Sequence, residues 1–514
     1  MTLSRSLSTA LSFRYGLLAL ALCMPVWHSG PVQAQWALPS MGDGADITTS
    51  EERQLGDRII RSLYRDPDYI DDPQLQAYVT RIWTPLVQVA KQRGDLSEEL
   101  SERFAWQILL GRDASINAFA LPGGYLGVHL GLIGAVTSSD ELATVMAHEL
   151  THVTQRHIAR MIGQEKKSTP LMVASMILGA LAASKSPDAA NALIVGGQAA
   201  MVQNQLGFSR DMEREADRIG YSLLAPAGFA PQGAVSMFEK LQQASRLNDN
   251  GSWPYLRSHP LTTERIADMQ NRVPQGQSQP PKSTMEHAML AARARVLTRP
   301  GIDKLRQWTQ QPMQPEFAQL SAMDQAGQWY AASLSYLQMR DVERARASWQ
   351  ALQQLVQAQG DTRAVQQVKW LGIELALAAQ QPQAAQQWLA AGKLEPDAAR
   401  PEILLSSQVL LALGQSREVA QRLQVWVAEH PQDGAAWRLL AQAWQAQGFH
   451  LRSLRAEAEA HVAHYDYAAA IDRFKAGQEA ARRGATQSDY IDASIIDTRL
   501  REVQSLWREQ SREQ

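Results

Sequence analysis

The chain has 514 residues, of which 45% are hydrophobic and 20% are charged, and its net charge at pH 7 is −2. This length predicts two or three domains with ample material for buried cores. The nearly neutral charge balance gives no electrostatic case for a nucleic-acid partner or for an anionic membrane surface.

The amino terminus has the pattern of a cleavable secretory signal. Arg5 and Arg14 precede an apolar run over 15–27, and small residues around Ala34 offer a cleavage site. A run of about 13 apolar residues is shorter than a membrane anchor requires. Cleavage after Ala34 would remove Cys23, the only cysteine, so no disulfide is expected. The pattern predicts a signal peptide over 1–34 and a periplasmic protein.

Two later apolar stretches, 170–183 and 190–202, could be mistaken for membrane spans. Each has about a dozen residues, whereas a spanning helix needs roughly 20. We interpret both as buried or lid helices, so we expect no integral membrane segment.

The residues that follow the signal predict helices first and strands afterwards. The segment 50–93 has apolar residues at helical spacing. Three apolar segments over 104–133 surround the turn at Pro122, Gly123 and Gly124, and they have the pattern of strands. The next helix is expected to begin near Glu141, after Ser139 and Asp140.

The motif "VMAHELTHVTQRHIAR", 145–160, suggests a metal site on this helix. In a continuous helix His148 and His152 stand about 40° apart on one face, with Glu149 beside them. Such a pair can bind one ion while the glutamate activates water. His157 would lie about 140° from His152, too far round to join the same ion. The spacing alone leaves open a solvated helix that carries two histidines by chance.

A catalytic zinc site needs a third protein ligand. Gln155 and Ile158 stand where a metzincin would have glycine and histidine, which excludes that class. In the helix predicted over 207–224, Glu213 and Asp217 share a face, so they suit a carboxylate ligand and an aspartate bonded to a ligand histidine. Glu215 is the rival ligand, but it points about 200° away from Glu213. A charged, solvated helix face is the alternative.

The composition changes at 273–283, where three prolines and polar residues predict a linker. The residues beyond it are almost entirely helical in pattern, and they repeat with a period of 34: Ile403, Leu410, Gly414 and Pro431 recur as Trp437, Trp444, Gly448 and Tyr465. This period resembles the tetratricopeptide repeat, with an irregular helical bundle as the alternative. A stacked array of this kind offers a concave face to a polypeptide partner.

Three segments in this order, "INAFALPGGYLGVHLGLI", "ELATVMAHELTHVTQRH" and "SRDMEREADRIG", resemble the gluzincin family of zinc metalloproteases that contains the CAAX prenyl protease. The likeness is closest to soluble periplasmic members with a tetratricopeptide tail. It implies a mainly α fold, in which an α+β zincin-like protease domain with a small sheet (35–272) precedes the linker and a helical repeat domain (284–514). The membrane spans of some members are missing, which argues against prenyl-protein processing.

The resemblance also implies the roles of the site residues. His148, His152 and Glu213 would bind one Zn²⁺ per chain, Glu149 would be the general base, and Asp217 matches the family's aspartate one turn after the third ligand. Sites of this composition also accept other divalent metals.

The function implied is that of an exported zinc endopeptidase, and a chaperone, for the quality control and assembly of outer-membrane beta-barrel proteins. Its partners would be unfolded or misassembled outer-membrane proteins and, through the repeats, the beta-barrel assembly machinery. Substrate would add a strand at Asn117, Ala118 and Phe119. No phosphate-binding loop is found, so turnover should need no ATP. The alternatives are a structural zinc site and a non-proteolytic repeat chaperone with a vestigial or regulatory metal site.

The segment 258–269 contains His259 and ends the protease half. Thr262 or Thr263 would cap the helix that follows, and His259 would then be only a residue of the capped turn, with no role at the metal. Alternatively, His259 stabilises the oxyanion, or it acts as a fourth metal ligand that holds the enzyme latent. We favour this gating role.

Overall fold

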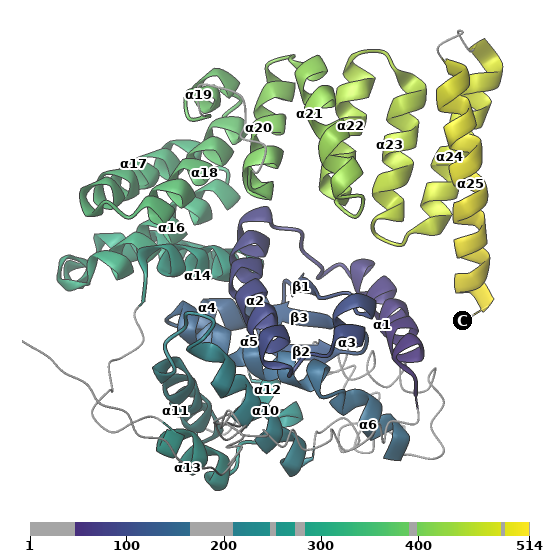
Figure 1. Cartoon of the computed structure of the whole chain (residues 1–514). Helices are drawn as coiled ribbons and strands as arrows, with labels where there is room; N and C mark the ends of the chain where they lie inside the picture. Colours follow the sequence, from purple (N-terminus) through teal and green to yellow (C-terminus); the bar gives the residue numbers. More distant parts are fainter. Residues whose placement is uncertain are drawn as a thin grey trace, which may run out of the picture. The chain divides into compact units, whose positions relative to one another are not determined.

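In the computed structural model, residues 47–164, 209–246, 253–272, 283–389, 398–484 and 489–512 are described (Figure 1). The predicted signal over 1–34 with Cys23, the apolar stretches 170–183 and 190–202, and linker residues 273–282 lie outside these ranges. The described chain is mainly helical with one small sheet, as predicted. No described helix is long and apolar enough to span a membrane.

Two helices open the described chain. Helix α1 (Thr49–Tyr64) begins with a capping box, because the Thr48 hydroxyl accepts from the Glu51 N–H and the Glu51 carboxylate accepts from the Thr48 N–H. Helix α2 (Pro73–Arg93) is capped by Asp72 and ends at Gly94, whose φ of 80° suits a residue without a Cβ. Its apolar face packs in the main core with helix α5 of the motif.

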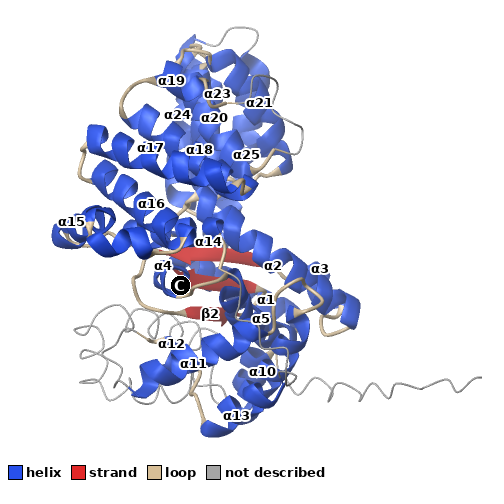
Figure 2. Ribbon diagram, turned by 90° about the vertical axis from the view of Figure 1, so that its left-hand side faces the viewer, coloured by secondary structure: helices blue, strands red, loops and turns tan. Residues whose placement is uncertain are grey.

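The sheet has the strand order β1-β3-β2, with β1 (Gln107–Gly111) parallel and β2 (Ala118–Leu121) antiparallel to β3 (Tyr125–His129). Figure 2 shows these strands in red among the helices. Strand β2 forms an edge of the sheet and contacts α5. The predicted strand over 125–133 is wrong in its second half, because helix α4 (Leu130–Ala135) begins directly after His129. Gly131 permits this change, since its backbone approaches that of Ala114 and Ser115 too closely for a Cβ.

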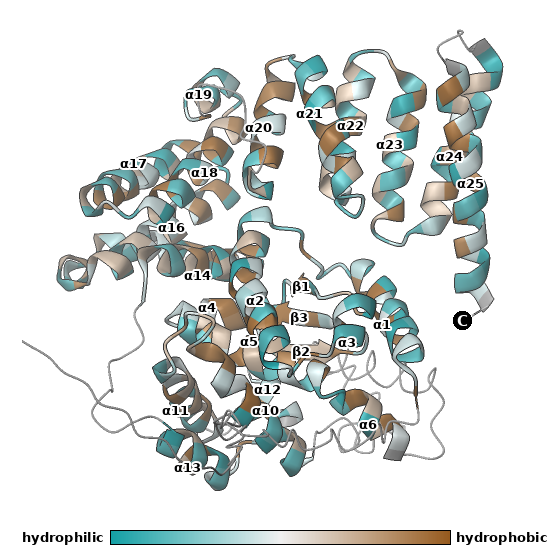
Figure 3. Ribbon diagram, in the orientation of Figure 1, coloured by the Kyte–Doolittle hydropathy of each residue, from teal (hydrophilic) through white to brown (hydrophobic). Residues whose placement is uncertain are grey.

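The motif helix α5 (Ser139–Thr154) is buried over nearly its whole length. The short apolar helix α4 that precedes it is mostly brown in Figure 3. The cap of α5 is Ser138, one residue before the predicted pair. The prediction of a continuous helix over 145–160 is wrong. Arg156 has a φ of 50°, and a new helix, α6, runs over His157–Gln164. The Arg156 side chain bonds Glu52 and the Ile47 carbonyl, so tertiary contacts hold the break.

Helix α10 (Arg210–Leu224) crosses α5 closely at Gly220, where a Cβ would lie only 3.1 Å from backbone atoms of Ala147 and His148. This contact holds α10, which carries Glu213 and Asp217, against the motif helix α5. The protease half continues through three helices: α11 (Gln232–Arg246), α12 (Tyr255–Ser258) and α13 (Thr263–Arg272). The Thr262 hydroxyl accepts from the Arg265 N–H, so the predicted cap at Thr262 is formed.

The second half consists of helices in pairs. Helices α20, α22 and α24 begin at Arg400, Gly434 and Tyr467, close to the predicted period. Gly414 and Gly448 occupy equivalent turns, with φ of 76° and 79°. The helices in chain order are α14 (Met285–Leu297), α15 (Ile302–Gln310), α16 (Ala322–Gln338), α17 (Val342–Gln359), α18 (Thr362–Ala378), α19 (Pro382–Gln386), α20 (Arg400–Ala412), α21 (Ser416–Glu429), α22 (Gly434–Ala446), α23 (His450–Val462), α24 (Tyr467–Gly484) and α25 (Asp489–Arg512).

Helix α14 joins the two halves. Its Leu290 and Ala294 belong to the main core of the protease half, whereas Met289 and Ala292 belong to the first core of the repeats. Its Arg293 also binds Asp72, the cap of α2. Because one helix is buried on both sides, the repeats are attached to the protease half by packed apolar and ionic contacts.

Candidate metal centre

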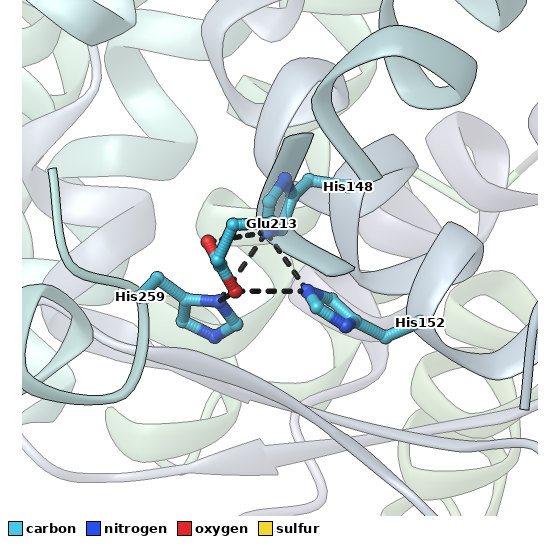
Figure 4. Close-up of side chains that lie close together, drawn as sticks. All are labelled: His148, His152, Glu213 and His259. Carbon is cyan, nitrogen blue, oxygen red and sulfur yellow. Dashed lines mark hydrogen bonds and ion pairs between the residues drawn. The ribbon is translucent and has the colours of Figure 1, made fainter. Parts of the chain in front are cut away.

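Four buried side chains from three segments converge beside α5 (Figure 4). His148 and His152 come from α5, Glu213 comes from α10, and His259 follows α12. One ligand atom of each lies within 4.8 Å of those of the other three. The Nε2 atoms of His148 and His152 are 2.9 Å apart, and Glu213 Oε1 lies 3.4 Å from His152 Nε2. Two imidazoles and a carboxylate at this spacing form a donor set for a divalent metal.

The second nitrogen of His148 is held by Asp217, one turn after Glu213. His148 Nδ1 lies 3.0 Å from Asp217 Oδ1. The Arg265 guanidinium donates two hydrogen bonds, of 2.6 and 2.8 Å, to the same carboxylate. Arg265 Nη1 also lies 2.7 Å from Glu213 Oε2. If His148 Nδ1 donates to the aspartate, Nε2 keeps its lone pair for a metal.

His152 has a different partner. Its Nδ1 lies 2.8 Å from Nδ1 of His157, and His157 Nε2 lies 3.1 Å from Glu215 Oε2. His157 is therefore not among the clustered ligands, but it touches one of them. Burial lowers the pKa of His157, although Glu215 opposes this shift. The bond to His157 contributes most to lowering the pKa of Glu215 to about 2.

The charges of the cluster suit a cation. Burial alone would lower the pKa of His148, but the carboxylates of Glu213 and Asp217 outweigh it and raise the pKa to about 10. The carboxylates therefore stabilise positive charge at this point. Since both ligand imidazoles have outside partners for Nδ1, their Nε2 atoms and Glu213 remain to bind a metal. The residues fit the metal that the motif predicts.

Glu149 lies at the boundary between the cluster and the sheet. Its Oε2 accepts a 2.9 Å hydrogen bond from the Ala120 N–H of β2. Its Oε1 is buried without a hydrogen bond among the described residues and lies 3.4 Å from His259 Nε2. Burial raises the pKa of Glu149, while His259 and His148 oppose this shift. A fixed carboxylate with a raised pKa and one available oxygen suits a general base.

His259 completes the cluster as its fourth member. Its Nδ1 lies 2.9 Å from Glu213 Oε1 and 3.3 Å from His148 Nε2. The Tyr255 ring stacks on it at 4.5 Å, and the His259 N–H donates to the Tyr255 carbonyl. With 2% of its surface exposed, His259 is buried with the other members of the cluster.

Of the residues predicted to bind substrate, Ala118 and Phe119 lie in the edge strand β2, and Asn117 directly precedes it. The His129 N–H donates to the Asn117 carbonyl, so Asn117 faces β3. Because hydrogen-bonding direction alternates along an antiparallel strand, Phe119 also faces β3, whereas Ala118 and Ala120 face the open edge. The Ala120 N–H contact to Glu149 agrees with this direction.

Sequence reasoning did not identify Arg265, which holds both Glu213 and Asp217. Arg265 and Met269 are one turn apart on α13 and both are buried, at 5% and 2% exposed. An arginine on the apolar face of an amphipathic helix was the available signal, because a buried guanidinium needs anionic partners. The contact between His157 and His152 had no such signal, since it depends on the break at Arg156.

The sequence matches the model of peptidase family M48 over residues 73–273. The beta-barrel assembly-enhancing protease of Escherichia coli K12 is 28% identical over 494 residues, which are 95% of this chain and 96% of that protein. A Vibrio cholerae protein provisionally given the same name is 33% identical over 348 residues, 66% of this chain and 67% of that protein. The mitochondrial metalloendopeptidase OMA1 of Saccharomyces cerevisiae is 28% identical over 232 residues, 43% of this chain and 64% of that protein. The resemblance to this family of metalloproteases is thus confirmed, and the chain belongs to peptidase family M48 and is a metalloendopeptidase.

Proposed function

We propose that this metalloendopeptidase is a periplasmic enzyme, exported by a signal peptide over 1–34, that binds one Zn²⁺ through His148, His152 and Glu213. Its clients are misassembled outer-membrane beta-barrel proteins, which it degrades and also assists as a chaperone. The names of the Escherichia coli and Vibrio cholerae relatives, which span most of the chain, support the beta-barrel clients. The observation that carries the proposal is the position of Glu149, which lies between the metal cluster and the open edge of β2.

Substrate would bind as an added strand on β2, with Ala118 supplying the backbone groups that face the open edge. Backbone pairing is largely independent of sequence, so it suits unfolded clients. Asn117 and Phe119 then support the strand through β3, and Phe119 also covers Gly127. Adding a strand here places the scissile carbonyl near Glu149, because the Ala120 N–H already holds that carboxylate at the same edge.

Zinc, when bound, supplies Lewis acidity, which polarises the peptide carbonyl and acidifies water. Glu149 Oε1 takes a proton from the attacking water as the new C–O bond forms. Glu149 then gives this proton to the amide nitrogen as the C–N bond breaks, so that the products are a carboxylic acid and an amine. Asp217 and Arg265 keep His148 and Glu213 in place throughout.

We assign residues 35–272 to the protease domain, 273–283 to the linker and 284–514 to a tetratricopeptide-like domain that binds clients and the beta-barrel assembly machinery. The helix pairs with a period near 34 residues support this assignment. Helix α14 packs in both the main core of the protease half and the first core of the repeats. Client binding to the repeats could therefore affect the protease half through contacts of α14. A mainly chaperone role remains the second candidate, and these repeats favour it.

His259 is expected to act as a gate. It occupies the fourth position of the cluster and lies against Glu149 Oε1, so it blocks the place where water and substrate would meet. Replacing His259 with alanine should raise peptide hydrolysis and self-cleavage. A tenfold rise would mean that the closed state is favoured by about 1.4 kcal/mol.

The rate of cleavage of an unfolded peptide tests this gate, with His461→Ala on α23, whose side chain is 40% exposed, as the control. If His259 instead stabilises the oxyanion, the rate should fall by about 10²–10³-fold. An unchanged rate would contradict both roles.

The experiment that tests the proposed function is complementation with Glu149→Gln. In cells that lack this protein, the variant should fail to restore outer-membrane assembly, and it should retain uncleaved beta-barrel proteins. Full restoration by Glu149→Gln would contradict the proteolytic role and favour the chaperone.

A further inference from the structure

His157 is the one histidine of the motif segment that does not belong to the metal cluster, yet it is completely buried. It is the first residue of α6 and faces back toward α5 because the chain turns at Arg156. Its two ring nitrogens contact different groups: Nδ1 lies 2.8 Å from His152 Nδ1, and Nε2 lies 3.1 Å from Glu215 Oε2. Arg160 Nη1 donates to the same Glu215 oxygen at 3.0 Å.

The hydrogens in this chain of contacts can be assigned from chemistry. An ionised carboxylate only accepts, so His157 Nε2 carries a hydrogen and donates it to Glu215. A neutral His157 then has its lone pair on Nδ1. The short contact between the two Nδ1 atoms requires one donor, so His152 must donate from Nδ1. The lone pair of His152 therefore lies on Nε2, the atom that faces His148 and Glu213.

We propose that His157 and Glu215 form a hydrogen-bond relay that fixes the tautomer and the orientation of His152 for metal binding. The relay, which consists of His157 and Glu215, with Arg160 paired to Glu215, rests on the proposed metal site. Glu215 is thus a positioning residue, and the acidic pair of α10 that contacts the metal cluster directly is Glu213 with Asp217.

The two ligand histidines are held in different ways. Asp217, paired with Arg265, contacts His148 directly. His152 has a neutral imidazole between it and its carboxylate, and that carboxylate has 29% of its side-chain surface exposed. Removing the His157 imidazole would take away the acceptor of the His152 Nδ1–H, so His152 could adopt the other tautomer, whose Nε2–H cannot bind a metal.

The test is the zinc affinity of the full-length protein, measured by competition with a chelator. His157→Leu should weaken zinc binding by about 10–100-fold, the usual effect of losing a partner of a ligand histidine. His157→Asn should restore the affinity to within about threefold of wild type, because its amide oxygen can take the place of the Nδ1 acceptor. Glu215→Ala should weaken binding by roughly tenfold. Asp211→Ala, an exposed change on the same helix, is the control and should have no effect.

A wild-type zinc affinity in His157→Leu would overturn the relay. An equal loss of zinc affinity in His157→Leu and His157→Asn would also overturn it, because such a result indicates that His157 has only a packing role. If His157→Leu does not fold, an unchanged affinity in Glu215→Ala overturns the relay instead. The proposed metal site fails separately: it is wrong if His148→Ala still binds zinc fully, whatever the His157 variants do.

Discussion

Replacing Glu149 with glutamine is expected to lower the rate of peptide hydrolysis by about 10²–10⁴-fold, the usual contribution of a general base. Glutamine keeps the shape and can still accept the hydrogen bond from the Ala120 N–H. It cannot take a proton at the position of Oε1, so water is not activated. Zinc binding should be retained, since Glu149 is not among the clustered ligand residues.

A matched control is available on the same helix. Glu141 is also a buried glutamate of α5, but it pairs with Lys240 and accepts from the Thr137 N–H, in contacts separate from the metal cluster. Glu141→Gln should lower the stability and leave kcat of the folded enzyme unchanged. The general-base assignment is wrong if Glu149→Gln keeps more than about a tenth of the wild-type kcat while Glu141→Gln behaves as expected.

The second large effect is expected at Arg293, where the repeats are attached to the protease half. Its guanidinium binds Asp72 at 2.6 and 3.0 Å and Glu374 at 2.8 and 2.9 Å, and only 5% of its side chain is exposed. Arg293→Met would leave the anionic partners without their cation, and Asp72 is also the cap of α2. Breaking a buried ion pair from one side costs about 3–5 kcal/mol.

Denaturant unfolding of the full-length protein measures this loss. Arg344→Met is the control, because Arg344 pairs with Asp341 at an exposed site and such pairs contribute at most about 1 kcal/mol. Equal losses of unfolding free energy in the two variants would contradict the attachment role of Arg293.

The grouping of the candidate site residues within each helix could be predicted because it depends on short-range spacing. His148 with His152, and Glu213 with Asp217, are each four residues apart within one helix, and each pair keeps its common face in the structure. The period of the repeats was equally local, since Gly414 and Gly448 mark equivalent turns. Helical periodicity fixes such relations without knowledge of the tertiary fold.

Features that depend on contacts between distant segments could not be predicted. The chain breaks at Arg156 because Glu52 and Ile47, about a hundred residues earlier, bind its side chain. The helix at Leu130 replaces a predicted strand because Gly131 packs against backbone that precedes β2. Arg265 reaches Glu213 and Asp217 only after α13 has docked. In each case tertiary packing overrides the local pattern.

The zinc content of the purified full-length protein tests the central claim most directly. The account predicts one zinc per wild-type chain and almost none in His148→Ala, because His148 lies within hydrogen-bond distance of both His152 and His259 at the centre of the cluster. Glu149→Gln should still carry one zinc. A full complement of zinc in His148→Ala would contradict the assignment of the site.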